Sequence, residues 1–355
     1  MSERPTVAVL GASGFVGTRL IEWLVLRDLA QVRPIVRSYR SLARVARFDL
    51  DWRLADARDP VALERAYRAA ARAGVRRLVY VSSAVVHGLA PAPGTHDESP
   101  LLAKQPFAYN VSKVLAEERL RRLRADGAVE VVTLRPMIVF GPRSRWWSAQ
   151  IAGDLLAGQA CLLDGGEGIC NTIYVDNLVH AMWQAAWAPG AANQDFLVAD
   201  GERVTWRDLY AAVAEAIGVA VDAVPSVPSA TLPKLLSAQR RAALRAAGRR
   251  FAWALGETLQ ATVVQTAREV LPSRLLDLLK PRWGALRALG AVSADTGAAG
   301  RPALVVDREM AALQSCRAVL PVDKARRLLG YAPPVPFAEG SRRTGAWLRF
   351  VFGLD

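Results

Sequence analysis

The sequence predicts an α/β protein in which helices cover both faces of a doubly wound parallel sheet. Short apolar runs typical of buried strands alternate with helical patterns from residue 6 to about residue 200, and parallel strands require such crossover helices. The first run ends in a glycine-rich turn that leads directly into a helix. Hydrophobic residues make up 52% of the 355 residues, enough to fill one large domain or two ordinary ones.

The first strand, turn and helix are predicted at residues 6–28, TVAVLGASGFVGTRLIEWLVLRD. The turn carries Gly11, Gly14 and Gly17 in the spacing GxxGxxG. Such glycines allow a tight turn, the approach of a pyrophosphate to the backbone and close packing of the helix on the strand. The motif therefore predicts dinucleotide binding, and the alternative is a glycine-rich turn without a ligand.

Arg37 lies near the end of the second predicted strand, residues 31–38, and 20 residues beyond Gly17. An acidic residue there would bind the adenosine ribose, whereas an arginine can pair with a 2′-phosphate. Arg37, together with Arg40, therefore favours NADP(H) over NAD(H), against the alternative of a solvated arginine. Pro34 is unusual within this strand because proline removes a ladder donor.

The alternation continues through six more strand or helix signals before the character of the chain changes. They are the strand DWRLAD at 51–56, a helix from about 60 to 74, the strand RRLVYVSS at 76–83, a helix beginning near Phe107, the strand EVVTLRPMIVFGP at 130–142 and the helix at 175–187. Prolines at 223–233 then lead into a basic helical region. We expect a nucleotide-binding domain at 1–145 and a smaller substrate domain at 146–355. The latter returns to the first domain at about 172–200 and carries an insertion at about 226–300.

Composition narrows the class of protein. Eleven Lys or Arg against three acidic residues between 234 and 287 supply 11 − 3 = +8 of the net charge of +13, so the rest of the chain is only mildly basic. Three cysteines without CxxC spacing and three scattered histidines predict neither a disulfide framework nor a metal site. The absence of a signal peptide pattern and of a long apolar run leads us to expect a cytoplasmic protein.

Tyr109 and Lys113 lie four positions apart in the helix that begins near Phe107, so they share one helical face. A polar helix shows such pairs by chance, and the pair alone is weak evidence of chemistry. In the order of the whole chain, however, the motifs resemble an extended short-chain dehydrogenase/reductase of the NAD(P)-dependent epimerase/dehydratase type. The resemblance rests on GASGFVG, ADARD, VYVSSAVVHG, YNVSK, LRPMIVFGP, IYVDNLVHA and KARRLLGYAP.

The resemblance implies a Rossmann-type domain and a catalytic group of Ser83, Tyr109 and Lys113. Tyr109 would be the base, Ser83 would hold the substrate oxygen with Ser82 as the fallback, and Lys113 would bind the nicotinamide ribose. Because a free phenol has a pKa of about 10, we expect the charge of Lys113 to lower the pKa of Tyr109. The implied cofactor contacts are Gly11, Ser13, Gly14, Phe15, Val16 and Gly17 at the pyrophosphate, Asp56 and Ala57 at the adenine, and Pro136 at the nicotinamide.

Three departures from the family pattern affect these expectations. His87 stands where the family usually has tyrosine, and Ile138 stands where sugar-nucleotide enzymes often have asparagine. Residues 60–83 have room for only one helix and one strand, so one central strand of the Rossmann sheet is missing. Because an empty position leaves two unpaired edges, we expect the strand at 76–83 to move beside the first strand.

We therefore expect an NADP(H)-preferring oxidoreductase or epimerase, with NAD(H) as the alternative cofactor, acting on a nucleotide-sugar or an apolar small molecule. The alternatives are a cofactor-binding scaffold with impaired catalysis and a steroid or lipid alcohol dehydrogenase at a membrane surface. The basic segment at 226–290 could bind anionic lipid or form a lid. A homodimer through the helix carrying Tyr109 is expected, and nucleic-acid binding is disfavoured because no recognition motif is present.

Overall fold

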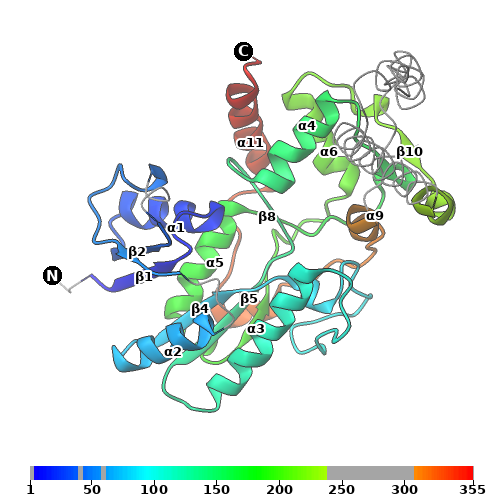
Figure 1. Ribbon diagram of the computed structural model, residues 1–355. Helices are drawn as coiled ribbons and strands as arrows, with labels where there is room; N and C mark the ends of the chain where they lie inside the picture. The colour runs from blue at the N-terminus through cyan, green and yellow to red at the C-terminus, as the bar shows by residue number, and fades with distance from the viewer. Residues whose placement is uncertain (1–3, 39–42, 57–60, 238–307, 355) are drawn as a thin grey trace, which may run out of the picture. The chain divides into compact units, whose positions relative to one another are not determined.

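The computed structural model describes residues 4–38, 43–56, 61–237 and 308–354 (Figure 1). The chain divides into one compact unit of Met1–Val227 and Asp307–Asp355 and a second unit of Pro228–Val306. Within the second unit the described part is 228–237, which contains the 3₁₀ turn η7 (Ser229–Thr231). Most of the predicted basic insertion therefore lies outside the described residues, and the predicted domain boundary at residue 145 stays a prediction.

The chain begins with a three-stranded parallel sheet. Its strands are β1 (Thr6–Leu10), β2 (Gln31–Val36) and β3 (Arg53–Leu54), in the order β1-β2-β3. The helix α1 (Phe15–Leu26) buries Leu20, Ile21 and Leu24 in the core of this sheet. β3 pairs only with Ile35 and Val36, so at Pro34 the described chain gives β2 a neighbour on one edge alone. The missing N–H of proline is tolerated at such an open edge.

A second parallel sheet follows, with the order β4-β5-β9. Its strands are β4 (Arg77–Val81), β5 (Glu130–Arg135) and β9 (Asp195–Leu197). The helices α2 (Ala62–Arg72) and α3 (Ala108–Arg124) pack against each other and cover one face of this sheet. Tyr67, Leu120, Leu123, Val129 and Val131 form the core between these elements.

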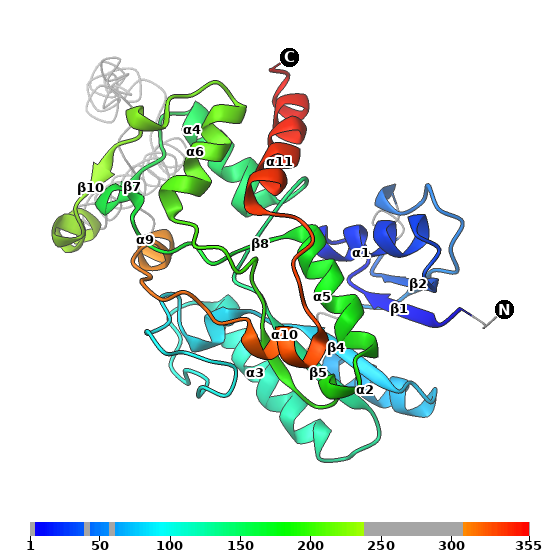
Figure 2. The ribbon, with the colours of Figure 1, turned by 180° about the vertical axis from the view of Figure 1, so that it is seen from behind.

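The prediction that the strand at 76–83 moves beside the first strand is wrong. In the described chain β4 pairs with β5, β1 pairs with β2, and no ladder joins β1 to β4. The helix α5 (Val175–Trp187) bridges the two sheets instead, because Val179 lies in the core of β1 and β2 while Leu178 lies in the core of β5 and β9 (Figure 2). Arg77 ties the start of β4 to the end of α5 by donating to the carbonyl oxygens of Ala185 and Ala188, at 2.8 Å each.

The segment predicted as one strand at 130–142 is two strands in different sheets. After β5 ends at Arg135, β6 (Ile138–Phe140) pairs with β8 (Thr172–Tyr174). Pro136 lacks the N–H that a continuing ladder would need, which explains a break at this point. The change of sheet carries the chain from the sheet β4-β5-β9 to a second layer that is mainly helical.

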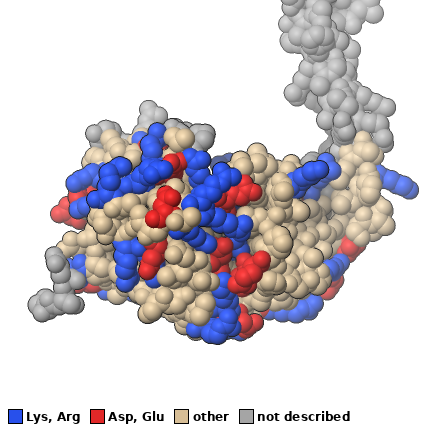
Figure 3. All heavy atoms as spheres, turned by 90° about the horizontal axis from the view of Figure 1, so that it is seen from below, with Lys and Arg blue, Asp and Glu red and all other residues tan. Residues whose placement is uncertain are grey.

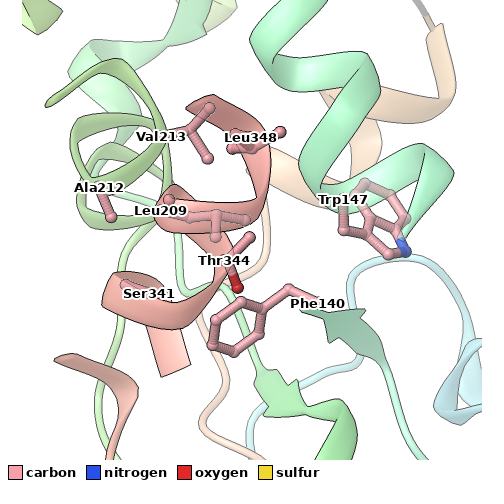
Figure 4. A pocket seen from close by; sticks show the side chains of 9 residues that line it. Phe140, Trp147, Leu209, Ala212, Val213, Ser341, Thr344 and Leu348 are labelled. Carbon is pink, nitrogen blue, oxygen red and sulfur yellow. The ribbon is translucent and has the colours of Figure 1, made fainter. Parts of the chain in front are cut away.

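That second layer packs α6 (Trp206–Ala216) against α11 (Phe337–Phe352). Gly345 allows the close approach, because a Cβ there would lie 2.8 Å from the Cβ of Ala216. Figure 4 shows Leu209 and Val213 of α6 facing Thr344 and Leu348 of α11 around a cavity of about 10 Å³. A cavity of this size holds one water at most, so it is a packing gap and not a ligand site.

The remaining short elements complete the first unit. They are η2 (Ala84–His87), η3 (Arg145–Gln150), α4 (Ile151–Leu156), β7 (Leu162–Leu163), η4 (Asp164–Gly166), η5 (Pro189–Ala191), η6 (Val221–Ala223), β10 (Ser226–Val227), which pairs with β7, α9 (Arg308–Gln314) and α10 (Asp323–Leu329). No helix in the part of the chain described by the structure has the length and apolar character needed to cross a membrane.

Candidate active site

The end of β4 and the beginning of α3 bring the three predicted catalytic residues together. Ser83 follows β4 and caps η2, where its Oγ accepts a hydrogen bond from the backbone N–H of Val85 at 3.4 Å. Tyr109 lies in the first turn of α3, and its side chain is hydrogen-bonded to Ser83. One turn later, the Nζ of Lys113 donates to the carbonyl oxygen of Val81 at 3.0 Å. Serine, phenol and ammonium therefore lie around one point at the carboxyl end of β4.

The electrostatics of Tyr109 differ from the sequence prediction. The surrounding protein disfavours the phenolate and raises the pKa of Tyr109, although 54% of the residue is exposed. The hydrogen bond from Ser83 opposes this rise, whereas Glu309 adds to it. Lys113 has a lowered pKa because it is buried, and Glu117 opposes this shift. The expected lowering of the pKa of Tyr109 by Lys113 is therefore not found, because the ammonium is directed to a backbone carbonyl.

A side-chain link holds the start of α3 against the turn that carries Ser83. The Nδ2 of Asn110, which is fully buried, donates to the Oε1 of Gln105 at 3.2 Å. The Nε2 of Gln105 in turn lies 3.0 Å from the carbonyl oxygen of Val85 and 3.3 Å from that of Val86. The link therefore joins η2, which begins immediately after Ser83, to the first turn of α3, which carries Tyr109. The sequence reasoning missed both amides.

Deeper in the same region, Arg135 joins α3 to two strands of the second sheet. Its guanidinium lies 2.6 Å from the Oε2 of Glu117 and 3.0 Å from the Oδ2 of Asp195. It also donates to the carbonyl oxygen of Asp97 at 2.7 Å. Glu117 lies one turn beyond Lys113 on the same helix face, and this spacing is the signal that could have revealed it. His87, a departure from the family pattern, lies beside this cluster with its Nε2 3.5 Å from Arg135.

The glycine-rich turn has the geometry that a dinucleotide pyrophosphate requires. Gly11 has a φ of +75°, and the N–H of Gly14 donates to the carbonyl oxygen of Gly11 at 2.9 Å. A Cβ at Gly17 would lie 2.3 Å from that same oxygen, so only glycine permits this packing. α1 has Gly14 as its N-cap and neither a side-chain cap nor an acidic residue in its first turn. The first N–H groups of the helix, from Phe15 onward, are thus left for an anionic ligand, and the residues fit a dinucleotide.

The other predicted cofactor residues lie at strand ends. Arg37 follows β2 and is exposed, and Asp56 lies two residues beyond β3. Because β1, β2 and β3 are parallel, their carboxyl ends lie side by side. Arg37 and Asp56 therefore lie at the same end of the sheet as the glycine-rich turn. Pro136 lies with the catalytic group, since its carbonyl oxygen accepts from the N–H of Ala84 at 2.8 Å. Ala57 and Arg40 lie outside the described residues, as the 57–60 and 39–42 segments do.

A cavity of about 330 Å³ lies near the start of α1 but is not lined by Ser83, Tyr109 or Lys113. Its charged residues are Arg19, Glu22, Arg143, Asp176 and Arg343. Arg19 makes two hydrogen bonds of 2.5 and 2.8 Å to Asp176, and Arg143 lies 2.8 Å from Glu22. Arg343 pairs with Asp176 as well, at 3.6 Å. The three arginines outnumber the two carboxylates of the cavity, and Arg343 also pairs with Glu339. These ion pairs join α1, α5 and α11.

The described chain is an α/β protein with a Gly-rich turn on one parallel sheet and a Ser, Tyr and Lys group on the next. Residues 64–199 match the sequence model of the NAD dependent epimerase/dehydratase family. This part of the chain is thus similar to that family, and the relatives and structural neighbours of the chain include a reductase, epimerases and a dehydratase.

Two curated relatives illustrate the range of the family. The 2-alkyl-3-oxoalkanoate reductase of Stenotrophomonas maltophilia is 32% identical over 158 residues, which are 42% of this chain and 48% of the reductase. The UDP-glucose 4-epimerase of Vibrio cholerae is 27% identical over 254 residues, which are 60% of this chain and 76% of the epimerase. The chain thus spans about half the length of the reductase and three quarters of the epimerase.

Solved structures show the same fold at low sequence identity. The UDP-glucuronic acid 4-epimerase from Bacillus cereus in complex with NAD is similar with a TM-score of 0.63 at 12% identity, covering 98% of this chain and 99% of that one. The epimerase Mth375 from Methanothermobacter thermautotrophicus has a TM-score of 0.60 at 16% identity, covering 99% of this chain and 94% of that one. These similarities concern the fold alone.

Proposed function

We propose that this chain is an NAD(P)-dependent oxidoreductase or epimerase that acts at a secondary alcohol or ketone. The observation that carries the proposal is the convergence of Ser83, Tyr109 and Lys113 at the end of β4. Together with the glycine-rich turn at the start of α1, this arrangement supplies both a proton-transfer group and an anion cradle. A bound nicotinamide would accept or supply the hydride.

The protein residues handle the proton and the substrate oxygen. In the oxidation direction Tyr109 takes the hydroxyl proton, and in the reduction direction the same phenol returns it to the carbonyl oxygen. Ser83 already bonds to Tyr109 and can hydrogen-bond the same substrate oxygen. The raised pKa of Tyr109 keeps the phenol neutral at neutral pH, as it would be in a free tyrosine, so it does not distinguish oxidation from reduction.

We propose NADP(H) as the preferred cofactor, with NAD(H) as the alternative. Arg37 is exposed at the sheet edge that also carries the glycine-rich turn, where a 2′-phosphate would require a cation. Isothermal titration of the full chain with NADP⁺ and NAD⁺ tests this proposal directly. Binding of neither cofactor would refute the proposed function, and tighter binding of NAD⁺ would refute the NADP preference alone.

The names of the relatives support two substrate classes. One class is an oxoalkanoate-like apolar ketone, and a 4-hydroxy-2-methyl-3-oxo-4-farnesyl-3,4-dihydroquinoline-1-oxide ketoreductase of Stigmatella aurantiaca, 26% identical over 255 residues, is of this kind. The other class is a nucleotide-sugar such as UDP-glucose. We place the apolar ketone first, because Ile138 stands where sugar-nucleotide enzymes often have asparagine, and an isoleucine side chain can neither donate nor accept a hydrogen bond. Turnover of a 3-oxoalkanoate but not of UDP-glucose would support this order, and the reverse result would contradict it.

A second candidate function is cofactor binding without efficient turnover. The observation that favours it is the break between β1 and β4, which separates the sheet with the glycine-rich turn from the sheet with Ser83. Cofactor binding without oxidation or reduction of a broad alcohol and ketone panel would support this alternative. Turnover of any member of the panel that is lost in Tyr109→Phe would exclude it.

The partner predictions remain proposals. Val111 and Leu115 on α3 are exposed, and a homodimer would cover them. Light scattering of the purified chain tests this, and a monomer would contradict it.

A peripheral membrane site at 226–290 depends on residues outside the described ones, and co-sedimentation with anionic and neutral vesicles tests it. On the face in Figure 3 acidic and basic side chains lie side by side, and the expectation that nucleic-acid binding is disfavoured stays a prediction.

A further inference from the structure

The ammonium of Lys113 is held from three directions. Its Nζ donates to the carbonyl oxygen of Val81 at 3.0 Å, lies 5.6 Å from the ring centre of Tyr109 and lies 5.1 Å from the ring centre of Tyr80. The backbone contact uses one of the three N–H donors of the ammonium. The two rings present apolar faces whose negative quadrupole attracts a cation within about 6 Å.

The alternation of β4 directs Tyr80 toward α3. Leu78 and Tyr80 pack with the core that lies between α2, α3 and the second sheet, whereas Val79 and Val81 pack on the side of α5. Tyr80 pairs in register with Thr133 of β5, so its backbone is fixed by the parallel ladder. A ring on a fixed strand therefore meets a lysine on a helix, and the flexible partner of the contact is the lysine.

We propose that Tyr80 is a positioning residue that holds the Lys113 ammonium beside Tyr109 by a cation–π contact. The inference rests on the proposed function, since the purpose of this placement is to present the remaining N–H donors of Lys113 to the cofactor ribose and to Tyr109. A lysine side chain has four rotatable carbon–carbon bonds, and one hydrogen bond to a carbonyl does not fix all of their torsions. The ring of Tyr80 supplies the second restraint, and its hydroxyl is not needed for it.

The first experiment measures the contact itself in the protein without cofactor. Reductive ¹³C-methylation labels the amines, and the chain contains only five lysines, so the spectrum is simple. Lys113→Arg assigns the Lys113 signal, which should be shifted upfield by the two rings. Tyr80→Leu should remove much of this shift, whereas Tyr80→Phe should retain it. Lys324, which lies 5.2 Å from the ring centre of Phe196, is an internal control whose signal should not change.

The second experiment measures the consequence for cofactor binding. The dissociation constant for NADP⁺ should rise about three- to tenfold in Tyr80→Leu and stay within about twofold in Tyr80→Phe, the range expected for a partly buried cation–π contact. Trp187→Leu is the matched control, because it removes a ring that lies 5.1 Å from the guanidinium of Arg76. It should leave the dissociation constant unchanged.

The outcomes separate the inference from the proposed function. An unchanged Lys113 signal in Tyr80→Leu would overturn the inference whether or not the protein binds a cofactor. A changed signal with an unchanged dissociation constant would overturn the positioning role. Failure of the wild-type chain to bind either cofactor would refute the proposed function, while the methylation experiment would still decide whether Tyr80 holds the ammonium.

Discussion

Arg135 and Glu117 form an ion pair that is almost completely removed from solvent, with exposed side-chain fractions of 0% and 2%. The pair connects the strand β5 with the helix that carries Tyr109 and Lys113. Its geometry is favourable, because the guanidinium of Arg135 donates several hydrogen bonds to the carboxylate of Glu117. Burial opposes the charge on Arg135, but these bonds and the negative charge of Glu117 raise its pKa. The orientation of α3 therefore depends on a buried contact further along the helix than Tyr109 and Lys113.

Removal of one partner of this pair should be costly. Glu117→Ala leaves the guanidinium of Arg135 buried with only part of its charge compensated, and we expect the free energy of unfolding to fall by about 3–5 kcal/mol. Urea denaturation of the wild type and the variant measures this. Arg207→Ala, which breaks an exposed pair with Asp222, should cost at most about 1 kcal/mol. Equal losses in the two variants would contradict the structural role of the buried pair.

The amide link between α3 and η2 should matter more for rate than for stability. Gln105→Leu removes the bonds to Asn110 and to the carbonyl of Val85, so Tyr109 and Ser83 lose one of the restraints on their separation. We expect kcat to fall about five- to tenfold, with a loss of roughly 1–2 kcal/mol in stability. Gln150→Leu is the control, since the exposed side chain of Gln150 donates to Asp154. Unchanged kcat in Gln105→Leu would show that the link is structural.

Tyr109→Phe should abolish turnover while leaving the cofactor dissociation constant nearly unchanged. The substitution removes the hydroxyl that is bonded to Ser83 but keeps the ring that lies over Lys113. Lys113→Ala should damage both turnover and cofactor binding, because it removes the ammonium donors. Steady-state kinetics and titration calorimetry separate the two effects. Full activity in Tyr109→Phe would show that the catalytic assignment is wrong.

Cofactor preference should depend on the charge after β2. Arg37→Asp replaces an exposed cation with a carboxylate that repels a 2′-phosphate and can accept a hydrogen bond from a free ribose hydroxyl. The ratio of the dissociation constants for NADP⁺ and NAD⁺ should therefore move toward NAD⁺ by about tenfold or more, as one lost charge-assisted contact implies. Arg33 lies within β2, four residues before Arg37 and away from the carboxyl end of the strand. Arg33→Asp should therefore not change this ratio.

The buried carboxyl of Asp200 should make stability depend on pH. Burial raises the pKa of Asp200 to about 7, against an ordinary value of 3.8, although it accepts hydrogen bonds from the N–H of Tyr174 and from Asn177. At a pH between the two pKa values, Asp200 is protonated in the folded chain and ionised in the unfolded chain. Its contribution to stability therefore falls as the pH rises from about 4 to about 7. Above this range the loss is complete.

Comparison of the wild type with Asp200→Asn isolates this effect. The amide cannot titrate but can keep one oxygen toward Tyr174 and Asn177, so the difference in unfolding free energy between the two proteins should change across pH 4 to 7 and then level off. Other carboxylates, such as Asp195 with its lowered pKa, contribute equally to both proteins and cancel. A difference that is independent of pH would contradict the shifted pKa.

Local spacing in the sequence determined the parts of this protein that short-range geometry controls. The glycine-rich turn follows from three glycines at fixed intervals, and the shared face of Tyr109 and Lys113 follows from the helical repeat. The helix predicted at 175–187 has the bounds of α5, because its apolar periodicity is continuous. The roles of the site residues stay predictions until the experiments above are done.

Only the tertiary structure decided which strands pair and which charges meet. The pairing of β4 with β5, and not with β1, depends on α5 covering both sheets at once, and no window of the sequence contains both contacts. The partners of Arg135 are likewise distant in sequence, since Glu117 and Asp195 lie 18 and 60 residues away. The pKa of Tyr109 is raised because desolvation by the surrounding protein outweighs the hydrogen bond from Ser83, and desolvation is a property of the folded chain as a whole.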